Sequence, residues 1–134
     1  ISYQPRTIMK LKHIAVACLS ALTLSACQTT KIEDLKTSAD QKTIDKAKER
    51  LSEYEWLEVS DNGVISYTEA LSGEGGRWKT SHVKELGYRL ACEDLRWFVE
   101  SGMIVRVYYR GSGGYLGDYD KERCETEIPS NIYE

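Results

Sequence analysis

The sequence has few of the residues on which metal and catalytic sites most often depend. Its 134 residues include two histidines, two prolines and one phenylalanine, and the formal net charge is −3 at pH 7. Two histidines argue against a histidine-rich metal site, and a slightly acidic chain lacks the basic excess that is typical of nucleic-acid binding. The length is that of a single domain. We therefore expect no metal, no cofactor and no nucleic-acid partner.

A hydrophobic run long enough to cross a membrane is lacking as well. The uncharged, mostly apolar stretch at residues 14–26 has 13 residues, which is about 20 Å of helix at roughly 1.5 Å per residue. A membrane-spanning helix needs about 20 residues. Because Lys10 and Lys12 precede the stretch and small residues end it, the segment is typical of a secretory signal.

The end of this stretch, Leu24-Ser25-Ala26-Cys27, resembles the bacterial lipobox. The resemblance implies that Cys27 is diacylated and becomes the N-terminus of the mature chain. Glutamine at position 28, rather than aspartate, implies an outer-membrane protein that is held by its lipid and faces the periplasm. We expect translation to start at Met9, so that residues 1–26 comprise upstream residues and the signal peptide. The alternative is a buried apolar helix that contains two cysteines.

The expected mature chain runs from residue 27 to residue 134. It has 108 residues, and its net charge is near −6 because three basic residues and no acidic ones leave with the signal. Residues 27–37 are mostly polar and predict a lipidated N-terminus followed by a short tether. Residues 38–134 are expected to form one domain around one modest core.

Two cysteines remain beside Cys27 in the mature chain. In an oxidising compartment the even pair Cys92 and Cys124 predicts one disulfide, which would close a loop across 32 positions. Two free buried thiols are one alternative. A zinc site that includes His82 is another, although no further cysteine could complete it.

The first half of the domain predicts a helix and a hairpin. Apolar residues recur at helical spacing over residues 39–54, and Ser38 fits the start of a capping box. Residues 56–60 and 64–71 have the composition of strands and are separated by Asp61-Asn62-Gly63. Asn-Gly between two such runs is a strong hairpin signal, because both residues tolerate a positive φ.

The second half predicts helices followed by another hairpin. Thr80 or Ser81 can cap a second helix, and Asp94 can cap a short third helix. Strands are expected at residues 103–110 and 115–122. The sum is the α+β class, with an antiparallel sheet of about four to five strands, helices packed on one face and one disulfide.

Candidate catalytic residues are few. His82 is the one histidine of the mature chain, and a lone histidine near a helix start is usually a surface or capping residue. Carboxylates are plentiful, so counting leaves a glycosidase pair open, with the densest clusters at Glu93-Asp94 and Asp118-Tyr119-Asp120. The second cluster lacks the remaining ligands of an EF-hand loop. We expect a protein that is not an enzyme and has no small-molecule substrate.

Aromatic residues are the more unusual feature. The sequence has nine tyrosines and three tryptophans. The adjacent pairs Trp97-Phe98 and Tyr108-Tyr109 put rings on opposite faces of their elements, so we expect some of them to be exposed. Exposed tryptophan and tyrosine are preferred anchors for protein partners.

Three segments of the second half resemble the type II secretion pilotins of the AspS, or GspS-beta, kind. They are residues 88–94 around Cys92, residues 100–105 and Asp120-Lys121-Glu122-Arg123-Cys124. The order of lipobox, amphipathic helix, hairpin, cysteine helix, hairpin and cysteine matches as well. Two features depart from the pattern, namely an arginine immediately before the second cysteine and an acidic tail from residue 125.

The resemblance implies a small outer-membrane lipoprotein with one disulfide, which binds the helical C-terminal segment of the secretin and carries it to the outer membrane. Such a helix would lie in an apolar groove. We expect the groove between the helices and the sheet, lined by Trp56, Tyr88, Trp97 and Phe98. Two alternatives remain, namely another periplasmic binding or inhibitor lipoprotein, such as a lysozyme inhibitor, and an envelope hydrolase.

Overall fold

The computed structural model describes residues 29–127. The expected signal peptide with its start at Met9, the expected lipidation site Cys27 and the tail after residue 127 lie outside the described residues. The chain divides into two compact units, Ile1–Lys31 and Ile32–Glu134, and the elements below belong to the second. None of the helices among residues 29–127 combines the length and the apolar character that crossing a membrane requires.

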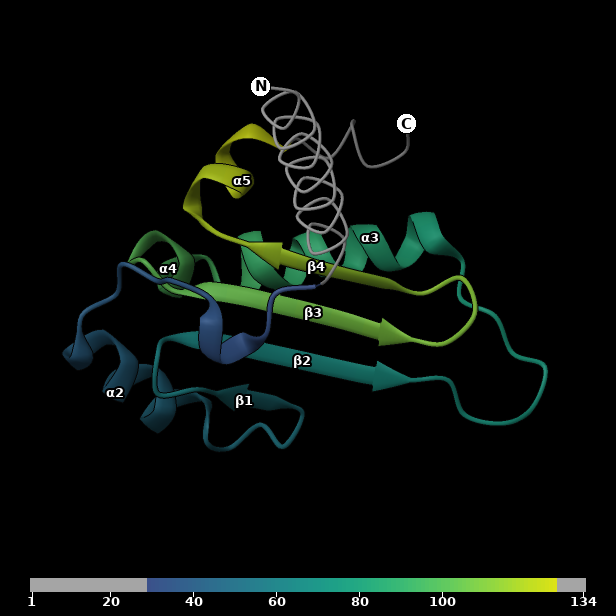
Figure 1. Ribbon diagram of the computed structural model, residues 1–134, viewed down its shortest axis with the longest axis horizontal. Helices are drawn as coiled ribbons and strands as arrows, with labels where there is room; N and C mark the ends of the chain where they lie inside the picture. Colours follow the sequence, from purple (N-terminus) through teal and green to yellow (C-terminus); the bar gives the residue numbers. More distant parts are fainter. Residues whose placement is uncertain (1–28, 128–134) are drawn as a thin grey trace, which may run out of the picture. The chain divides into compact units, whose positions relative to one another are not determined.

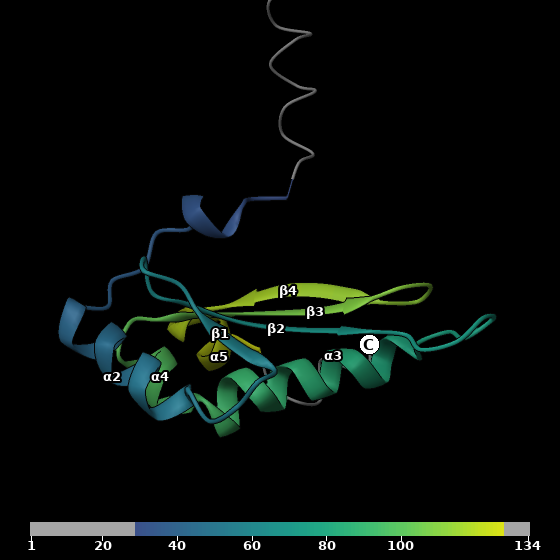
Figure 2. The same cartoon turned by 90° about the horizontal axis from the view of Figure 1, so that it is seen from below.

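The second unit is a single four-stranded sheet with helices (Figure 1). Figure 2 shows the sheet from its edge, with α2, α3, α4 and α5 on one side of it. The α+β class, the four strands and the helices on one face confirm the prediction. In chain order the elements are η2 (Ile32–Asp34), α2 (Gln41–Leu51), β1 (Leu57–Val59), β2 (Val64–Ala70), α3 (Thr80–Arg89), the π-helical turn η3 (Leu90–Asp94), α4 (Arg96–Glu100), β3 (Ile104–Arg110), β4 (Tyr115–Tyr119) and α5 (Lys121–Thr126).

The sheet is mixed, where the sequence analysis predicted a purely antiparallel one. β1 with β2 and β3 with β4 are antiparallel hairpins, but β2 and β3 pair in parallel, from Val64 beside Ile104 to Ala70 beside Arg110. A parallel pair requires a crossover connection of about a dozen residues or more. The connection through α3, η3 and α4 supplies this crossover, so the sheet order is β1-β2-β3-β4.

Helix α2 is shorter than predicted, and its N-cap is Asp40 rather than Ser38. The Asp40 carboxylate accepts a hydrogen bond from the Thr43 N–H at 2.8 Å. The backbone N–H groups of Ser38 and Ala39 instead both donate to the carbonyl of Gly102, at 3.1 and 3.2 Å. Gly102 has a φ of +99°, which glycine adopts without strain. The chain before α2 is therefore tied to the turn between α4 and β3.

The segment before α2 is also tied to the turn of the first hairpin, and we call residues 32–39 the strap. Asn62 Nδ2 donates to the carbonyls of Ile32 and Leu35, at 2.8 and 3.0 Å. The Thr37 hydroxyl donates to the Asn62 carbonyl at 2.5 Å. The predicted hairpin turn thus serves a second purpose, because its asparagine side chain holds residues that the sequence analysis assigned to the tether.

The hydrophobic core lies between the sheet and the helices. The strand register places Val105 between Ile65 on one side and Tyr119 on the other, and each of these three side chains is at most 1% exposed. Burying a large apolar side chain contributes roughly 1.5–3 kcal/mol, so this layer is a main source of stability. The helical layer of the core supplies Ile44, Ala47, Leu51, Val83, Ala91, Cys92, Leu95, Phe98 and Val99.

Gly87 marks the point at which α3 lies close against the sheet. A Cβ atom at Gly87 would lie 2.8 Å from Cγ2 of the fully buried Val107. We expect Gly87→Ala to lower the free energy of unfolding by about 1–3 kcal/mol, because overpacking would force the helix away from β3. Urea denaturation of the two proteins measures this difference.

Gly76→Ala is the matched control, because a Cβ atom at Gly76 would meet only the Leu71 side chain, at 3.7 Å or more. Its free energy of unfolding should stay within about 0.5 kcal/mol of the parent value. A Gly87→Ala protein as stable as the parent would mean that α3 does not pack on β3 this closely.

Candidate functional site

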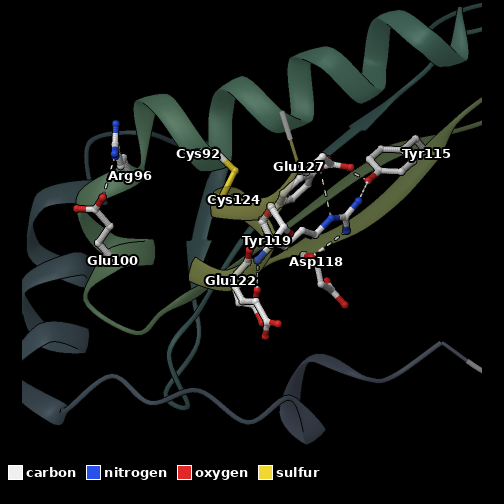
Figure 3. Close-up of a disulfide and its surroundings, with 12 residues drawn as sticks. Cys92, Arg96, Glu100, Tyr115, Asp118, Tyr119, Glu122, Cys124 and Glu127 are labelled. Carbon is white, nitrogen blue, oxygen red and sulfur yellow. Dashed lines mark hydrogen bonds and ion pairs between the residues drawn. A yellow bond between two sulfur atoms is a disulfide. The ribbon is translucent and has the colours of Figure 1, made fainter. Parts of the chain in front are cut away.

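The two cysteines that were predicted to pair do form a disulfide, with their Cα atoms 5.4 Å apart. Cys92 lies in η3, directly after α3, and Cys124 lies in α5. Figure 3 shows the bond reaching from the crossover helices to α5. A helix of six residues such as α5 is too short to be stable alone, so this covalent bond is one of the contacts that hold it in place.

The chain between α3 and α4 differs from the predicted helix break with an Asp94 cap. The N-cap of α4 is Leu95, and no side chain caps it. The Leu95 N–H donates to the Leu90 carbonyl at 2.9 Å, which closes a π-helical turn. In this wider turn Cys92 is buried whereas Glu93 and Asp94 are exposed. Single π-helical turns are frequent at functional sites.

A hollow of about 340 Å³ lies beside the disulfide. Tyr88, Val99 and the two bridged cysteines form part of its lining. The lining combines these apolar groups with side chains of both charge signs. Arg96 and Glu100 of this lining form an ion pair at 2.8 Å (Figure 3). The charged lining residues are Glu93, Arg96, Glu100, Lys121 and Glu125.

A second hollow, of about 290 Å³, adjoins the first, because Val99 and Lys121 line both. Its remaining lining comes from residues 36–38 of the strap, from residues 102–104 and from residues 120–122 at the start of α5. We call the two hollows together the α5 furrow. Helices α4 and α5 and the strap thus contribute to one recessed surface.

Arg123 holds α5 to the sheet. Its guanidinium donates to the Tyr115 hydroxyl at 2.6 Å and to the Asp118 carbonyl at 2.9 Å, and it lies 4.2 Å from the ring centre of Tyr119. An ion pair of 3.4 Å joins it to Glu127 (Figure 3). The arginine that departs from the pilotin pattern therefore has a structural role here, and α5 is fixed both by the disulfide and by this side chain.

Sequence reasoning missed α5. It continued the last strand to residue 122, whereas β4 ends at Tyr119 and the helix begins at Lys121. The Asp120 carboxylate caps the helix by accepting a hydrogen bond from the Arg123 N–H at 2.8 Å. The signal for this helix was present, since an aspartate followed by lysine, glutamate and arginine is typical of a helix start.

The four residues that were predicted to contact a partner do not share one surface. Tyr88 lines the α5 furrow. Trp97 is 45% exposed, whereas Phe98, with its ring centre 5.1 Å from that of Trp97, is 7% exposed and belongs to the core. Trp56 is 56% exposed and lies beside Tyr54. Of the four residues, only Tyr88 is part of the furrow.

The space between the helices and the sheet, where the sequence analysis expected a groove, is filled by core side chains. The recessed surface lies between helices instead. The sequence pattern did not reveal it, because the furrow depends on α5 and on the strap, neither of which was predicted in its observed place.

The residues considered for catalysis or metal binding lie at surface, ion-pair and helix-cap positions. His82 is exposed in the first turn of α3. Asp118 accepts two hydrogen bonds from Arg106, at 2.6 and 2.9 Å, and Asp120 is the cap of α5. Within the part of the chain that the structure describes, no group of three His, Cys, Asp or Glu side chains is placed to hold a metal ion.

Loss of the disulfide should destabilise the domain. We expect Cys92→Ala/Cys124→Ala to lose about 3–4 kcal/mol of unfolding free energy, because the bond spans 32 positions. Urea denaturation measures the loss. A reducing agent should destabilise the parent by a similar amount and leave the double variant unchanged. A loss below about 1 kcal/mol would mean that α5 does not depend on the bond.

Stability should also fall in alkali. Burial, and next the charge of Glu69, raise the pKa of Tyr109 to about 12, and burial also raises the pKa of Tyr119. The folded protein holds these protons more tightly than the unfolded chain does. The free energy of unfolding should therefore keep its full value below about pH 10 and fall as the pH rises toward about 12. Urea denaturation across this range, with tyrosinate absorbance recorded in parallel, measures the fall.

Tyr109→Phe is the control for this titration, because it removes one hydroxyl from the core without removing the ring. Its stability should decline less steeply with pH than that of the parent. An unfolding free energy that rises through the same range would contradict the direction assigned to these tyrosines.

Comparison with protein-family models, with curated proteins and with solved structures found no match to this chain. Its candidate function therefore rests on the residues of the chain itself, namely those of the α5 furrow, the disulfide and the strap.

Proposed function

We propose that this protein is an outer-membrane lipoprotein of the pilotin kind, which binds the C-terminal segment of a type II secretion secretin and carries it to the outer membrane. The observation that carries the proposal is the α5 furrow, two adjoining hollows of about 340 and 290 Å³ beside a helix that a disulfide fixes. A lipid on Cys27 would attach the protein to the membrane, and the furrow would hold the cargo.

The furrow suits one face of an amphipathic helix. Such a helix presents apolar anchors at positions i, i+3, i+4 and i+7, and two adjoining hollows can each receive an anchor. Tyr88, which is partly exposed, would contact the apolar side chains. The lining residues Arg96 and Lys121 would face acidic groups at the margin of that helix, and the three glutamates that line the first hollow would face basic ones.

The walls of the furrow are held in place before any partner arrives. The disulfide joins α5 to η3, and Arg123 joins the same helix to Tyr115 and to the Asp118 backbone. A binding surface that is already ordered loses less conformational entropy on association. This supports a role in which affinity for a peptide segment matters and no chemical step is needed.

A second candidate function is inhibition of an envelope enzyme such as lysozyme. It has support in the loop between β2 and α3, which extends past the end of the sheet in Figures 1 and 2. Residues 72–77 of this loop are exposed and mostly small or charged. A protruding polar loop of this kind could enter the active site of another protein.

The binding test is co-purification of the full chain, in detergent, with the C-terminal segment of the secretin. Tyr88→Ala and Lys121→Glu alter the furrow. Each should raise the dissociation constant of the complex at least about tenfold, which is about 1.4 kcal/mol of binding free energy. His82→Ala, on the exposed surface of α3, is the matched control and should bind like the parent. Furrow variants that bind normally would place the partner elsewhere.

The delivery test is made in cells. A strain without this protein should fail to assemble the secretin in the outer membrane. Cys27→Ser should release the protein from the membrane while the furrow is kept, so that it binds the secretin segment without delivering it. Secretin multimers in the outer membrane of the deletion strain would refute the pilotin function. Lysozyme inhibition that is lost when residues 73–76 are deleted would support the second candidate instead.

A further inference from the structure

A separate surface lies at the edge of the sheet, where β1 ends before β2 does. β1 pairs with β2 only from Ile65 to Tyr67, whereas β3 pairs with β2 as far as Ala70. Among residues 29–127, residues 68–70 therefore have no strand partner on their outer side, and Figure 1 shows this half of β2 running on past β1. All three residues are exposed. An unpaired strand edge is a template for another extended chain.

The backbone of Ala70 presents its hydrogen-bonding groups to the open side. The Leu71 N–H donates to the Arg110 carbonyl at 3.3 Å, on the β3 side, and the Val64 carbonyl accepts from the Ser60 N–H at 2.9 Å, on the β1 side. Successive residues of a strand direct these groups to opposite neighbours. The N–H and C=O of Ala70 consequently point toward the side where β1 is missing.

A hollow of about 150 Å³ lies beside this edge, lined by Glu55, Trp56, Glu58, Ser66 and Thr68. We call it the Trp56 hollow. The indole of Trp56 is 56% exposed, and both glutamates are exposed. Neither glutamate forms an ion pair within residues 29–127.

The chemistry of the Trp56 hollow is that of a site for a cation. Two carboxylates beside one indole ring attract an ammonium or guanidinium group, the carboxylates by charge and the ring by its quadrupole. The hydroxyl groups of Ser66 and Thr68 add acceptors at the same place. A phosphate or a second acidic surface would be repelled by the same carboxylates.

We propose that this edge binds an extended peptide segment that carries a lysine or arginine side chain. The segment would add a strand beside residues 68–70, with its main chain bonded to Ala70 and its basic side chain in the Trp56 hollow. Strand addition gives affinity through the main chain, and specificity comes from pockets for alternate side chains. A docked helix has its own backbone groups satisfied and would leave the edge unused.

This surface is independent of the proposed pilotin function. The Trp56 hollow and the α5 furrow share no lining residue. Tyr88→Ala, which alters the furrow, should therefore leave binding at the strand edge unchanged, so the two proposals can fail separately.

The test uses the full chain in detergent and a dye-labelled, end-blocked octapeptide that alternates threonine and lysine. Its binding is measured by fluorescence anisotropy against a matched peptide in which glutamate replaces every lysine. The basic peptide should bind at least about tenfold more tightly than the acidic one. Trp56→Ala and Glu55→Gln/Glu58→Gln should each remove most of this preference. Equal binding of both peptides, or no binding of the basic one, would overturn the proposal.

The strand-addition step has its own pair of variants. Ala70→Pro removes the N–H that faces the open side, at an edge position where proline is tolerated. It should weaken binding of the basic peptide at least about fivefold. Ala70→Val keeps this N–H and should bind like the parent. Normal binding by Ala70→Pro would overturn the strand geometry. Urea denaturation shows whether Ala70→Pro folds. If it does not fold, the NMR chemical shifts of the backbone amides of residues 68–70 in the parent protein are measured as the basic peptide is added. Unchanged chemical shifts would overturn the strand geometry.

Discussion

The parallel pairing of β2 with β3 is the constraint on which the remaining arrangement depends. Parallel neighbours begin at the same end of a sheet, so the chain must travel back between them, and α3, η3 and α4 form this return path. The return path places Cys92 where Cys124 can reach it. The same pairing supports β2 beyond the end of β1, because β3 continues beside residues that β1 does not cover.

The two recessed surfaces would recognise a partner by different physical means. The α5 furrow offers side chains, with apolar groups and both signs of charge, and its shape depends on the bonds that hold a short helix. The Trp56 hollow lies beside an open strand edge and offers carboxylates and one indole ring. Because they share no lining residue, a single partner with a helical and an extended segment, or two partners, could occupy both.

Features decided by neighbouring residues were predictable, and features decided by distant contacts were not. Asn62-Gly63 specified the first hairpin locally, and cysteine chemistry specified the disulfide. The direction of β3 relative to β2 depends on how a long connection packs, which no local pattern records. The pair Trp97-Phe98 shows the same limit, because adjacency predicted that some rings are exposed but did not show that Phe98 belongs to the core. Ser38 is not the cap of α2, and its amide donates to the distant Gly102 carbonyl, a contact that no local pattern records.

If Cys27 carries a lipid, as we propose, the strap would limit how far the domain could stand from a bilayer. Asn62 already holds the chain at Ile32, five positions after Cys27. A fully extended chain spans at most about 3.6 Å per residue. With a lipid on Cys27, the linker between the lipid and the strap would therefore be no longer than about 18 Å. With so short a linker, a partner would be bound and released close to the lipid headgroups, and the domain would have little freedom to change its orientation to the membrane.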